Sequence, residues 1–337
     1  MQSADRPELP PLLYLSAEAV RAAMPPVMER IELARRTMIA LIMDAEMPPK
    51  LGVDARPNSS HTAAMPALLR GTDPAGTRDL LGMKWVTAFP TNRVLGLPAI
   101  HATVVLNDAM TGTPVAILDG GPITAERTAA VSGVALQQWW PQTEGPTAVT
   151  LAGGGVQGAS HVAVLAAVAQ GAALTICDRH LDRAERLAGV AREIGRFESV
   201  ASTTDLLAAV DGADVVLTMV SFGQERQILP ADSMSRASLI IAVDYDMCIP
   251  AETARNSSLF LSDDVAQLLA TRRGAVFADY PEPDASIGEA LVGTAPAPRP
   301  SGPLYVNHLG VGLADVVFAD AIARRAAELG LGVELPR

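Results

Sequence analysis

The chain has 337 residues, which is enough for about two domains with a sizeable buried core. Its formal net charge of −11 argues against nucleic acid or an anionic membrane as a partner, and no apolar run is long enough to span a bilayer. The polar start, Gln2 to Pro11, does not resemble a signal peptide, and Cys177 and Cys248 are isolated, so we expect a soluble cytoplasmic protein without a disulfide or metal site.

The first ~120 residues predict a mixed domain of helices and antiparallel strands. Ser16 is placed to cap its first helix, and Pro25-Pro26 opens the second. Turn-rich pieces join the later strands, as in a meander. A long helix from Thr124 to about Trp139 then leads into the second domain. The expected elements before it are a strand at 12–15, a helix from 17, a helix over 27–43, and strands at 82–89, 101–107 and 113–119.

From residue 147 onward, apolar strands alternate with helical stretches, a pattern typical of a doubly wound parallel sheet. The segment 281–303 is rich in proline and glycine and predicts a mostly irregular connection. A closing helix over 313–329 is expected to return to the first domain. We therefore predict an α/β protein with a Rossmann-type nucleotide domain, 126–312, and an α+β domain made of 1–125 with 313–337. The expected strands of the nucleotide domain are 147–152, 173–177, 198–201, 214–219, 237–243, 258–262 and 304–307.

A glycine-rich turn follows the first of these strands. Gly153, Gly155 and Gly158 have the G-x-G-x-x-G spacing between a strand and a helix, and Asp178 stands at the end of the next strand. Such a turn holds a pyrophosphate at the helix N-terminus, while the acid accepts hydrogen bonds from a ribose diol. Asp178 favours NAD(H), although Arg179 beside it leaves NADP(H) possible. The residues expected to bind the cofactor are Gly153, Gly155, Val156, Gln157, Gly158, Asp178, Arg179 and Thr218.

Other residues are candidates for chemistry on a substrate. Lys84 lies in an otherwise apolar strand, which fits either an edge lysine or a cation aimed into a cleft. Arg127 lies among small residues at the start of the long helix, where it either forms an exposed ion pair or anchors an anion. Asp244 and Asp246 follow the fifth parallel strand and either cap a loop or overlook the cofactor cleft. Two weaker candidates, Lys50 and His61, lie in expected loops.

Together these segments resemble the ornithine cyclodeaminase/mu-crystallin family over nearly the whole chain. The stretches around Lys84 and Arg127 are specific to that family, and together they are stronger evidence than the nucleotide motif. The matching segments are 64–67 (AMPA), 82–86 (GMKWV), 105–108 (VLND) with 111–112, 123–132 (ITAERTAAVS), 153–157 (GGGVQ) and 309–315 (LGVGLAD).

The resemblance implies a homodimer whose N-terminal domain binds a small amino-acid or imino-acid substrate. Carried over by position, Lys84 and Arg127 hold the substrate's α-carboxylate, with Lys84 close to the reacting nitrogen. We therefore expect these two cations to converge on a cavity that faces the nicotinamide. Asp246 best matches the family's proton-carrying acid, and Asp244, two residues away, is its rival. Lys50 and His61 complete the expected substrate-binding set.

Two departures from the family pattern bear on the reaction. The first carboxylate anchor is usually arginine, but Lys50 stands there, and lysine cannot make a planar two-pronged contact. The segment 243–250 (VDYDMCIP) lacks the usual Gly-x-Asp-x-Pro-Gly pattern. The sequence therefore predicts an NAD(H)-dependent oxidoreductase that acts on the C–N bond of an amino acid or its imine. The alternatives are a cyclodeaminase that recycles NAD+ and a nucleotide-dependent binder without catalysis. The substrate side chain stays open.

Overall fold

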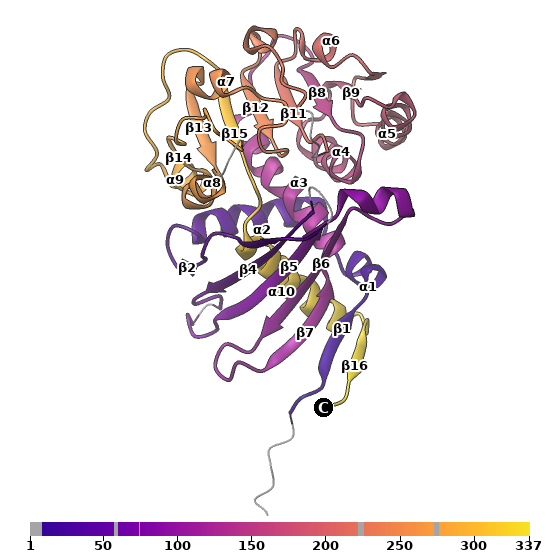
Figure 1. Cartoon of the computed structure of the whole chain (residues 1–337), viewed down its shortest axis with the longest axis vertical. Helices are drawn as coiled ribbons and strands as arrows, with labels where there is room; N and C mark the ends of the chain where they lie inside the picture. Colours follow the sequence, from indigo (N-terminus) through magenta and orange to yellow (C-terminus); the bar gives the residue numbers. More distant parts are fainter. Residues whose placement is uncertain (1–8, 57–59, 74, 222–225, 273–275) are drawn as a thin grey trace, which may run out of the picture.

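The computed structural model describes residues 9–56, 60–73, 75–221, 226–272 and 276–337. Within them, the chain forms two sheets, one mostly antiparallel and one parallel (Figure 1). The long helix α3 (Gly120–Trp139) runs between the two layers and is buried along most of its length. The predicted α/β architecture is confirmed.

The first sheet has the strand order β16-β1-β7-β6-β5-β4-β2, with β3 paired to β4. Its neighbours are antiparallel except for β1, which lies parallel to β7. Lys84 of β5 lies opposite Met65 on one side and Val104 on the other. The strands are β1 (Leu12–Leu15), β2 (Ala45–Glu46), β3 (Leu51–Asp54), β4 (His61–Leu69), β5 (Leu80–Ala88), β6 (Ile100–Asn107), β7 (Pro114–Asp119) and β16 (Val333–Leu335).

One face of this sheet is covered by helices. Helix α10 (Gly312–Glu328) packs against β4, β5 and β6, and it also contacts α2 (Val27–Ala40) and α3. Ser16 caps α1 (Ala17–Ala22), as expected, by accepting a hydrogen bond from the Ala19 amide. The return of α10 to the first sheet places side chains from the end of the chain beside those of β5.

The second sheet is entirely parallel, with the order β10-β9-β8-β11-β12-β15-β13-β14. Its strands are β8 (Ala148–Ala152), β9 (Ala173–Cys177), β10 (Ser199–Thr203), β11 (Val215–Thr218), β12 (Leu239–Ala242), β13 (Leu259–Ser262), β14 (Ala285–Ser286) and β15 (Leu304–Asn307). Its helices are α4 (Val156–Val168), α5 (Leu181–Ile194), α6 (Leu206–Val210), α7 (Ala251–Asn256), α8 (Val265–Thr271) and α9 (Ile287–Val292), and the short 3-10 helices of the chain are η1 (Pro90–Leu95) and η2 (Ala231–Met234).

The sequence missed several elements. Strand β4 was overlooked because its sequence, HTAAMPALL, is poor in β-branched residues and contains Pro66. The prediction of a mostly irregular segment over 281–303 is wrong where β14 and α9 form, and Ser286 and Glu289 make a capping box at the start of α9. Helix α3 begins four residues before Thr124, with Asp119 as its cap, because proline is tolerated in a first turn. No helix in the described ranges is long and apolar enough to cross a membrane.

Candidate functional site

The turn between β8 and α4 shows why its glycines are needed. Gly153 has φ +124°, and a Cβ there would lie 2.5 Å from the Met219 carbonyl oxygen. A Cβ on Gly158 would lie 2.1 Å from the Gly153 carbonyl oxygen. At Gly155, by contrast, a Cβ would meet no atom within 4 Å. Two glycines therefore let the strand, turn and helix pack closely, and Gly155 keeps open space in front of the α4 N-terminus.

A hollow lies beside this turn at the carboxyl ends of the strands. Asp178 lines it, and the side chain accepts hydrogen bonds from the Gly154 amide (2.9 Å) and the His180 amide (2.9 Å). Arg179 lines the same hollow. The hollow is lined by Ala152, Gly153, Gly155, Cys177, Asp178, Arg179, Arg183, Thr204, Leu206, Met219, Val220, Ser221 and Gln227.

Four of the expected cofactor residues lie outside the lining of this hollow, and one of them is Gly158, whose packing against the Gly153 carbonyl oxygen is described above. Val156 is exposed on the first turn of α4. Gln157 follows it, and its Oε1 is buried without a hydrogen-bond partner among the described residues. Thr218 is fully buried, and its hydroxyl donates to Asp244 Oδ1 over 2.9 Å. Thr218 therefore serves the packing of the strand ends, while the buried Gln157 oxygen is a group that a ligand at this helix start can satisfy.

Lys84 and Arg127 meet at a single carboxylate. The Lys84 Nζ lies 2.7 Å from Asp315 Oδ2, and the Arg127 Nε donates to Asp315 Oδ1 over 3.0 Å. Lys84 also donates to the Thr124 hydroxyl at 3.4 Å. The exposed fractions are 1% for Lys84, 4% for Arg127 and 0% for Asp315. The two cations thus converge, but at a fully buried point and around an acid contributed by this same chain.

The electrostatics of this cluster act mainly on Lys84. Burial lowers the pKa of Lys84, and Arg127 and Lys50 lower it further by charge repulsion, whereas Asp315 raises it. The net effect brings the Lys84 pKa to about 7. A lysine with a pKa near neutrality can both hold and release a proton under physiological conditions.

Lys50 joins the cluster from the other side. Its Nζ donates to the Leu309 carbonyl oxygen (2.6 Å) and to the Tyr245 hydroxyl (3.2 Å), and it lies 5.6 Å from the Tyr245 ring centroid. Leu309 precedes Gly310, which has φ +83°. Gly310 packs closely on the Arg127 guanidinium, and a Cβ there would lie only 2.3 Å from an Nη atom. The 309–310 backbone thus positions both cations.

Asp263 holds the same backbone segment in place. Its carboxylate accepts from the Leu309 amide (3.2 Å) and the Gly310 amide (2.6 Å). Burial raises the pKa of Asp263, while Lys50, the two amides and Arg127 counteract that rise. Asp263 is therefore a buried acid that faces the cation cluster through the 309–310 turn.

The two aspartates after β12 have different surroundings. Asp244 is 1% exposed and accepts hydrogen bonds from Thr218 and from the Val220 amide (3.0 Å). Burial raises the Asp244 pKa to about 6 against the lowering effect of these bonds. Asp246 accepts from the Phe277 amide (2.9 Å) and forms a 2.8 Å ion pair with Arg226, whose side chain is 35% exposed. Asp244 thus ties the ends of β11 and β12 together, whereas Asp246 faces a partly exposed cation.

His61 does not join this cluster. It begins β4, and its Nδ1 lies 3.0 Å from Asp54 Oδ1 of the neighbouring strand β3. Both side chains are largely exposed, at 51% and 89%. Within this chain the His61 ring therefore faces solvent, and we do not assign it to substrate.

Sequence reasoning gave no role to Asp315 or Asp263. Asp315 lies in a segment that resembles the family, and an acid in the first turn of an apolar helix is an indication that the sequence does contain. Asp263 follows a buried strand, a position that often overlooks a ligand cleft in parallel sheets. Neither partner could be found from the sequence, because each pairing joins residues far apart in the chain.

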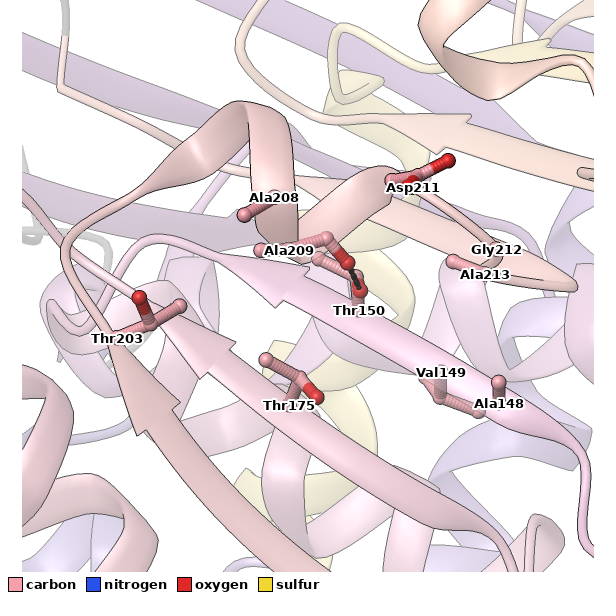
Figure 2. A pocket seen from close by; sticks show the side chains of 10 residues that line it. All are labelled: Ala148, Val149, Thr150, Thr175, Thr203, Ala208, Ala209, Asp211, Gly212 and Ala213. Carbon is pink, nitrogen blue, oxygen red and sulfur yellow. Dashed lines mark hydrogen bonds between the residues drawn. The ribbon is translucent and has the colours of Figure 1, made fainter.

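A second hollow lies over the parallel sheet beside helix α6 (Figure 2). Threonines of three neighbouring strands line it, namely Thr150, Thr175 and Thr203, and the Thr150 hydroxyl donates to the Ala209 carbonyl oxygen. Asp211 is the one ionisable residue in its lining. With so little charge and no convergent donors, this hollow is a weaker candidate site than the buried cluster.

Comparisons with known proteins point to one family. The model of the ornithine cyclodeaminase/mu-crystallin family matches residues 16–328. The nodulation efficiency protein NfeD of Rhizobium meliloti is 32% identical over 290 residues, which cover 85% of this chain and 86% of that protein. The Delta(1)-pyrroline-2-carboxylate/Delta(1)-piperideine-2-carboxylate reductase of Azospirillum brasilense is 30% identical over 264 residues, covering 75% and 81% respectively.

Among solved structures, the Delta(1)-pyrroline-2-carboxylate reductase of Thermococcus litoralis, in complex with NADH and L-proline, has the same fold. Its TM-score is 0.80 at 21% identity, and the match covers 96% of this chain and 100% of that one. The family model spans the whole parallel sheet, the first sheet apart from β1 and β16, and the segments that carry Lys84, Arg127 and Asp315. The chain therefore belongs to the ornithine cyclodeaminase/mu-crystallin family.

Proposed function

We propose that this protein is an NAD(H)-dependent oxidoreductase that acts on the C–N bond of an amino acid or its imine. The proposal rests on Lys84, a buried lysine whose pKa is lowered to about 7. Lys84 and Arg127 both form ion pairs with the carboxylate of Asp315. Imine reduction needs a proton donor for the nitrogen and an anchor for the carboxylate. Lys84 can supply the proton donor, and Arg127 can supply the carboxylate anchor.

The residues of the β8–α4 turn fit a dinucleotide. The open space at Gly155 and the α4 N-terminus are suited to a pyrophosphate, and the Gln157 Oε1, which lacks a partner among the described residues, is suited to a hydroxyl or N–H donor of the nucleotide. The Asp178 carboxylate lines the hollow and repels a 2′-phosphate, which favours NAD(H) over NADP(H). Bound NADH supplies the hydride that reduces the imine carbon.

The chain's own residues do the remaining work. Arg127 gives its Nε to Asp315 and offers its two Nη groups to a substrate carboxylate. Lys50 adds a second positive charge beside it. Lys84 delivers a proton to the nitrogen as the imine is reduced, and it takes a proton back in amino-acid oxidation. Burial of the cluster excludes water that would hydrolyse the imine.

We assign proton exchange with solvent to Asp246 in preference to Asp244. The carboxylate oxygens of Asp244 both accept bonds that hold the ends of β11 and β12. Asp246 is paired with the partly exposed Arg226, so a proton passing through Asp246 has a shorter route to water. An Asp246→Asn variant that keeps full activity would contradict this assignment.

The test is a spectrophotometric assay of NADH oxidation with a panel of imines. Cyclic imino acids such as Δ1-pyrroline-2-carboxylate come first, because related proteins are named reductases of these compounds. Pyruvate with ammonia and imines of glyoxylate complete the panel. We expect turnover with at least one member, and loss of it in a Lys84→Met variant that still binds NADH.

The outcomes of this assay separate the candidate reactions. Absence of turnover across the panel, with NADH binding intact, would overturn the proposal. Release of ammonia from ornithine or lysine without net NADH formation would indicate a cyclodeaminase instead. Tight ligand binding that survives Lys84→Met, with no turnover in either variant, would indicate a binder without catalysis.

We also propose that two copies pair through the first sheet. α10 covers one face of this sheet, and large apolar side chains are exposed on its strands, among them Leu51 (62% exposed), Val53 (61%) and Trp85 (40%). Leu51 and Trp85 both lie opposite Ala64, so they occupy one row across the sheet. An exposed apolar row of this kind indicates a protein contact.

The pairing is tested by light scattering coupled to size-exclusion chromatography. We expect a dimer for the unaltered chain and a monomer for Trp85→Asp. Leu207→Asp, at a residue 50% exposed on α6 of the other sheet, is the matched control and should stay dimeric. A monomeric unaltered chain would contradict the proposal.

For location, we propose the cytoplasm. The support is that Cys177 and Cys248 are both buried and both free thiols, as is usual in a reducing compartment. Fractionation of cells that express the tagged protein would test this. Recovery in an extracellular or membrane fraction would contradict it.

A further inference from the structure

Two buried histidines are linked by a serine deep in the molecule. The Ser132 Oγ of α3 lies 2.8 Å from His161 Nε2 of α4 and 2.8 Å from His308 Nε2, just after β15. The other nitrogen of His161, Nδ1, lies 2.7 Å from the Gln157 carbonyl oxygen. Exposure is 0% for His161 and Ser132 and 1% for His308. The chain of contacts thus runs from the start of α4 to the end of β15.

The direction of every hydrogen bond in this chain can be derived. Burial lowers the pKa of both histidines to about 3, so each ring is neutral and carries one proton. The main-chain carbonyl oxygen of Gln157 can only accept a hydrogen bond, and therefore the proton of His161 is on Nδ1. The bare Nε2 of His161 then accepts from the Ser132 hydroxyl, which has only one proton to give.

The same assignment of donors and acceptors determines the tautomer of His308. Because the single hydroxyl proton of Ser132 is used in the hydrogen bond to His161, the Ser132 oxygen must accept a hydrogen bond from His308. The Nε2 of His308 therefore carries the proton of that ring. Its Nδ1 is therefore a bare lone pair. This atom is buried and has no hydrogen-bond partner among the described residues. Such an unmatched acceptor destabilises the folded protein when nothing satisfies it.

His308 stands beside the residues that carry the proposed reaction. Its amide donates to Ala242 at the end of β12. The next residue, Leu309, accepts from Lys50, and Gly310 packs on Arg127. Arg127 and Lys50 both act electrostatically on the His308 ring. The bare nitrogen therefore belongs to the same buried region as the two proposed carboxylate anchors.

We propose that His308 is a specificity-determining residue whose Nδ1 accepts a hydrogen bond from an N–H group of the ligand bound beside Lys50 and Arg127. A lone pair repels a carboxylate or keto oxygen but accepts an amine or amide N–H. The role of His308 rests on the proposed function, since it completes recognition of a nitrogen-bearing ligand at that site. Two sources have this chemistry, namely the amino nitrogen of the substrate and the carboxamide of the nicotinamide.

The test is nitrogen NMR of the full chain labelled in its histidine rings, with the His308 resonances assigned by their loss in His308→Asn. In the free protein we expect a pyridine-type Nδ1 and a pyrrole-type Nε2. The probes are NAD+ alone, NAD+ with L-proline, and NAD+ with cyclopentanecarboxylate, which has the same carboxylate without an N–H. A change in Nδ1 with NAD+ alone identifies the carboxamide as donor. A change with L-proline and not with cyclopentanecarboxylate identifies the substrate nitrogen.

Binding of the same probes to variants gives a second measurement. His308→Leu should weaken the donor-bearing probe by about tenfold or more, the effect of one hydrogen bond to a polar or charged group. His308→Asn, whose side-chain oxygen can take the place of Nδ1, should restore part of the loss. A protonated Nδ1 in the free protein, or an Nδ1 resonance that no probe moves, overturns the inference. Neither the NMR measurement nor the binding measurement requires turnover. Failure of imine reduction alone would therefore contradict the proposed function without contradicting the role of His308.

Discussion

Asp315 and Lys84 form an ion pair, with Nζ and Oδ2 2.7 Å apart, in which neither side chain reaches solvent. The lysine comes from β5 and the aspartate from the first turn of α10, so the pair joins a strand of the first sheet to the last helix. Since Arg127 shares the same carboxylate, the acid offsets two cations. Burial is the main cause that brings the Lys84 pKa to about 7, and repulsion by Arg127 and Lys50 adds to it against the opposing effect of Asp315.

Replacement of Asp315 by Asn should destabilise the protein strongly. The change leaves two buried cations without a counter-charge, and breaking a buried pair in this way costs about 3–5 kcal/mol. The free energy of unfolding, from urea denaturation, measures the effect. Asp54→Asn, at an exposed pair with His61, is the control and should cost less than about 1 kcal/mol. Equal losses in the two variants would contradict the central place given to Asp315.

Activity should depend on the protonation of Lys84. Its pKa of about 7 means that the ammonium form predominates below neutrality and disappears above it. The kcat/KM for imine reduction should therefore be level at low pH and fall about tenfold per pH unit beyond the pKa. Amino-acid oxidation needs the neutral amine, so its rate should rise through the same range. A pH profile of both directions checks this, and a flat reductive profile from pH 6 to 9 would exclude Lys84 as the proton donor.

Gly310→Ala should damage the site without touching the nucleotide turn. The new Cβ would lie 2.3 Å from an Arg127 Nη atom, on a backbone with φ +83°. We expect a KM for the substrate at least about tenfold higher, together with destabilisation above the ~1–2 kcal/mol of left-handed backbone strain. Gly293→Ala, at φ +77° in open space, is the matched control for strain alone. An unchanged KM in Gly310→Ala would show that Arg127 does not hold the substrate.

Asp178→Asn should change the choice of cofactor. The Gly154 and His180 amides donate to different oxygens of Asp178, so Asn keeps an acceptor for one of them and removes the negative charge that repels a 2′-phosphate. NADH affinity should fall several-fold and NADPH affinity should rise, with Arg179 available to the phosphate. Fluorescence titration of both nucleotides gives the ratio. If the ratio of the two dissociation constants stays constant, Asp178 does not select the nucleotide.

The parallel sheet could be predicted because its strands are buried on both faces and form continuous apolar runs such as Leu239–Ala242. Strand β4 escaped prediction because alanine, methionine and Pro66 interrupt the usual strand composition, and its place is fixed by pairing with β5. The β14–α9 segment escaped for a related reason, since the prolines around it mask a capping box that needs only four residues.

Lys84 and Arg127 could be singled out because a cation in an apolar segment is costly unless it has a purpose. Their common partner could not be foreseen, since Asp315 lies 188 positions beyond Arg127. The hydrogen-bond chain through Ser132 was also invisible in the sequence, because His161 and His308 belong to segments that meet only in the folded protein. Sequence patterns identify which side chains are unusual, whereas the fold decides which of them touch.

The separation between Arg127 and Asp315 also sets an order of events during synthesis. A ribosome that has made Arg127 must add 188 more residues before the acid that neutralises it exists. Until then, the nascent chain carries Lys84 and Arg127 without the carboxylate that pairs with both of them in the folded protein. Closure of the buried centre therefore waits for the synthesis of α10, and a chain cut short before Asp315 cannot form the centre that joins Lys84 to Arg127.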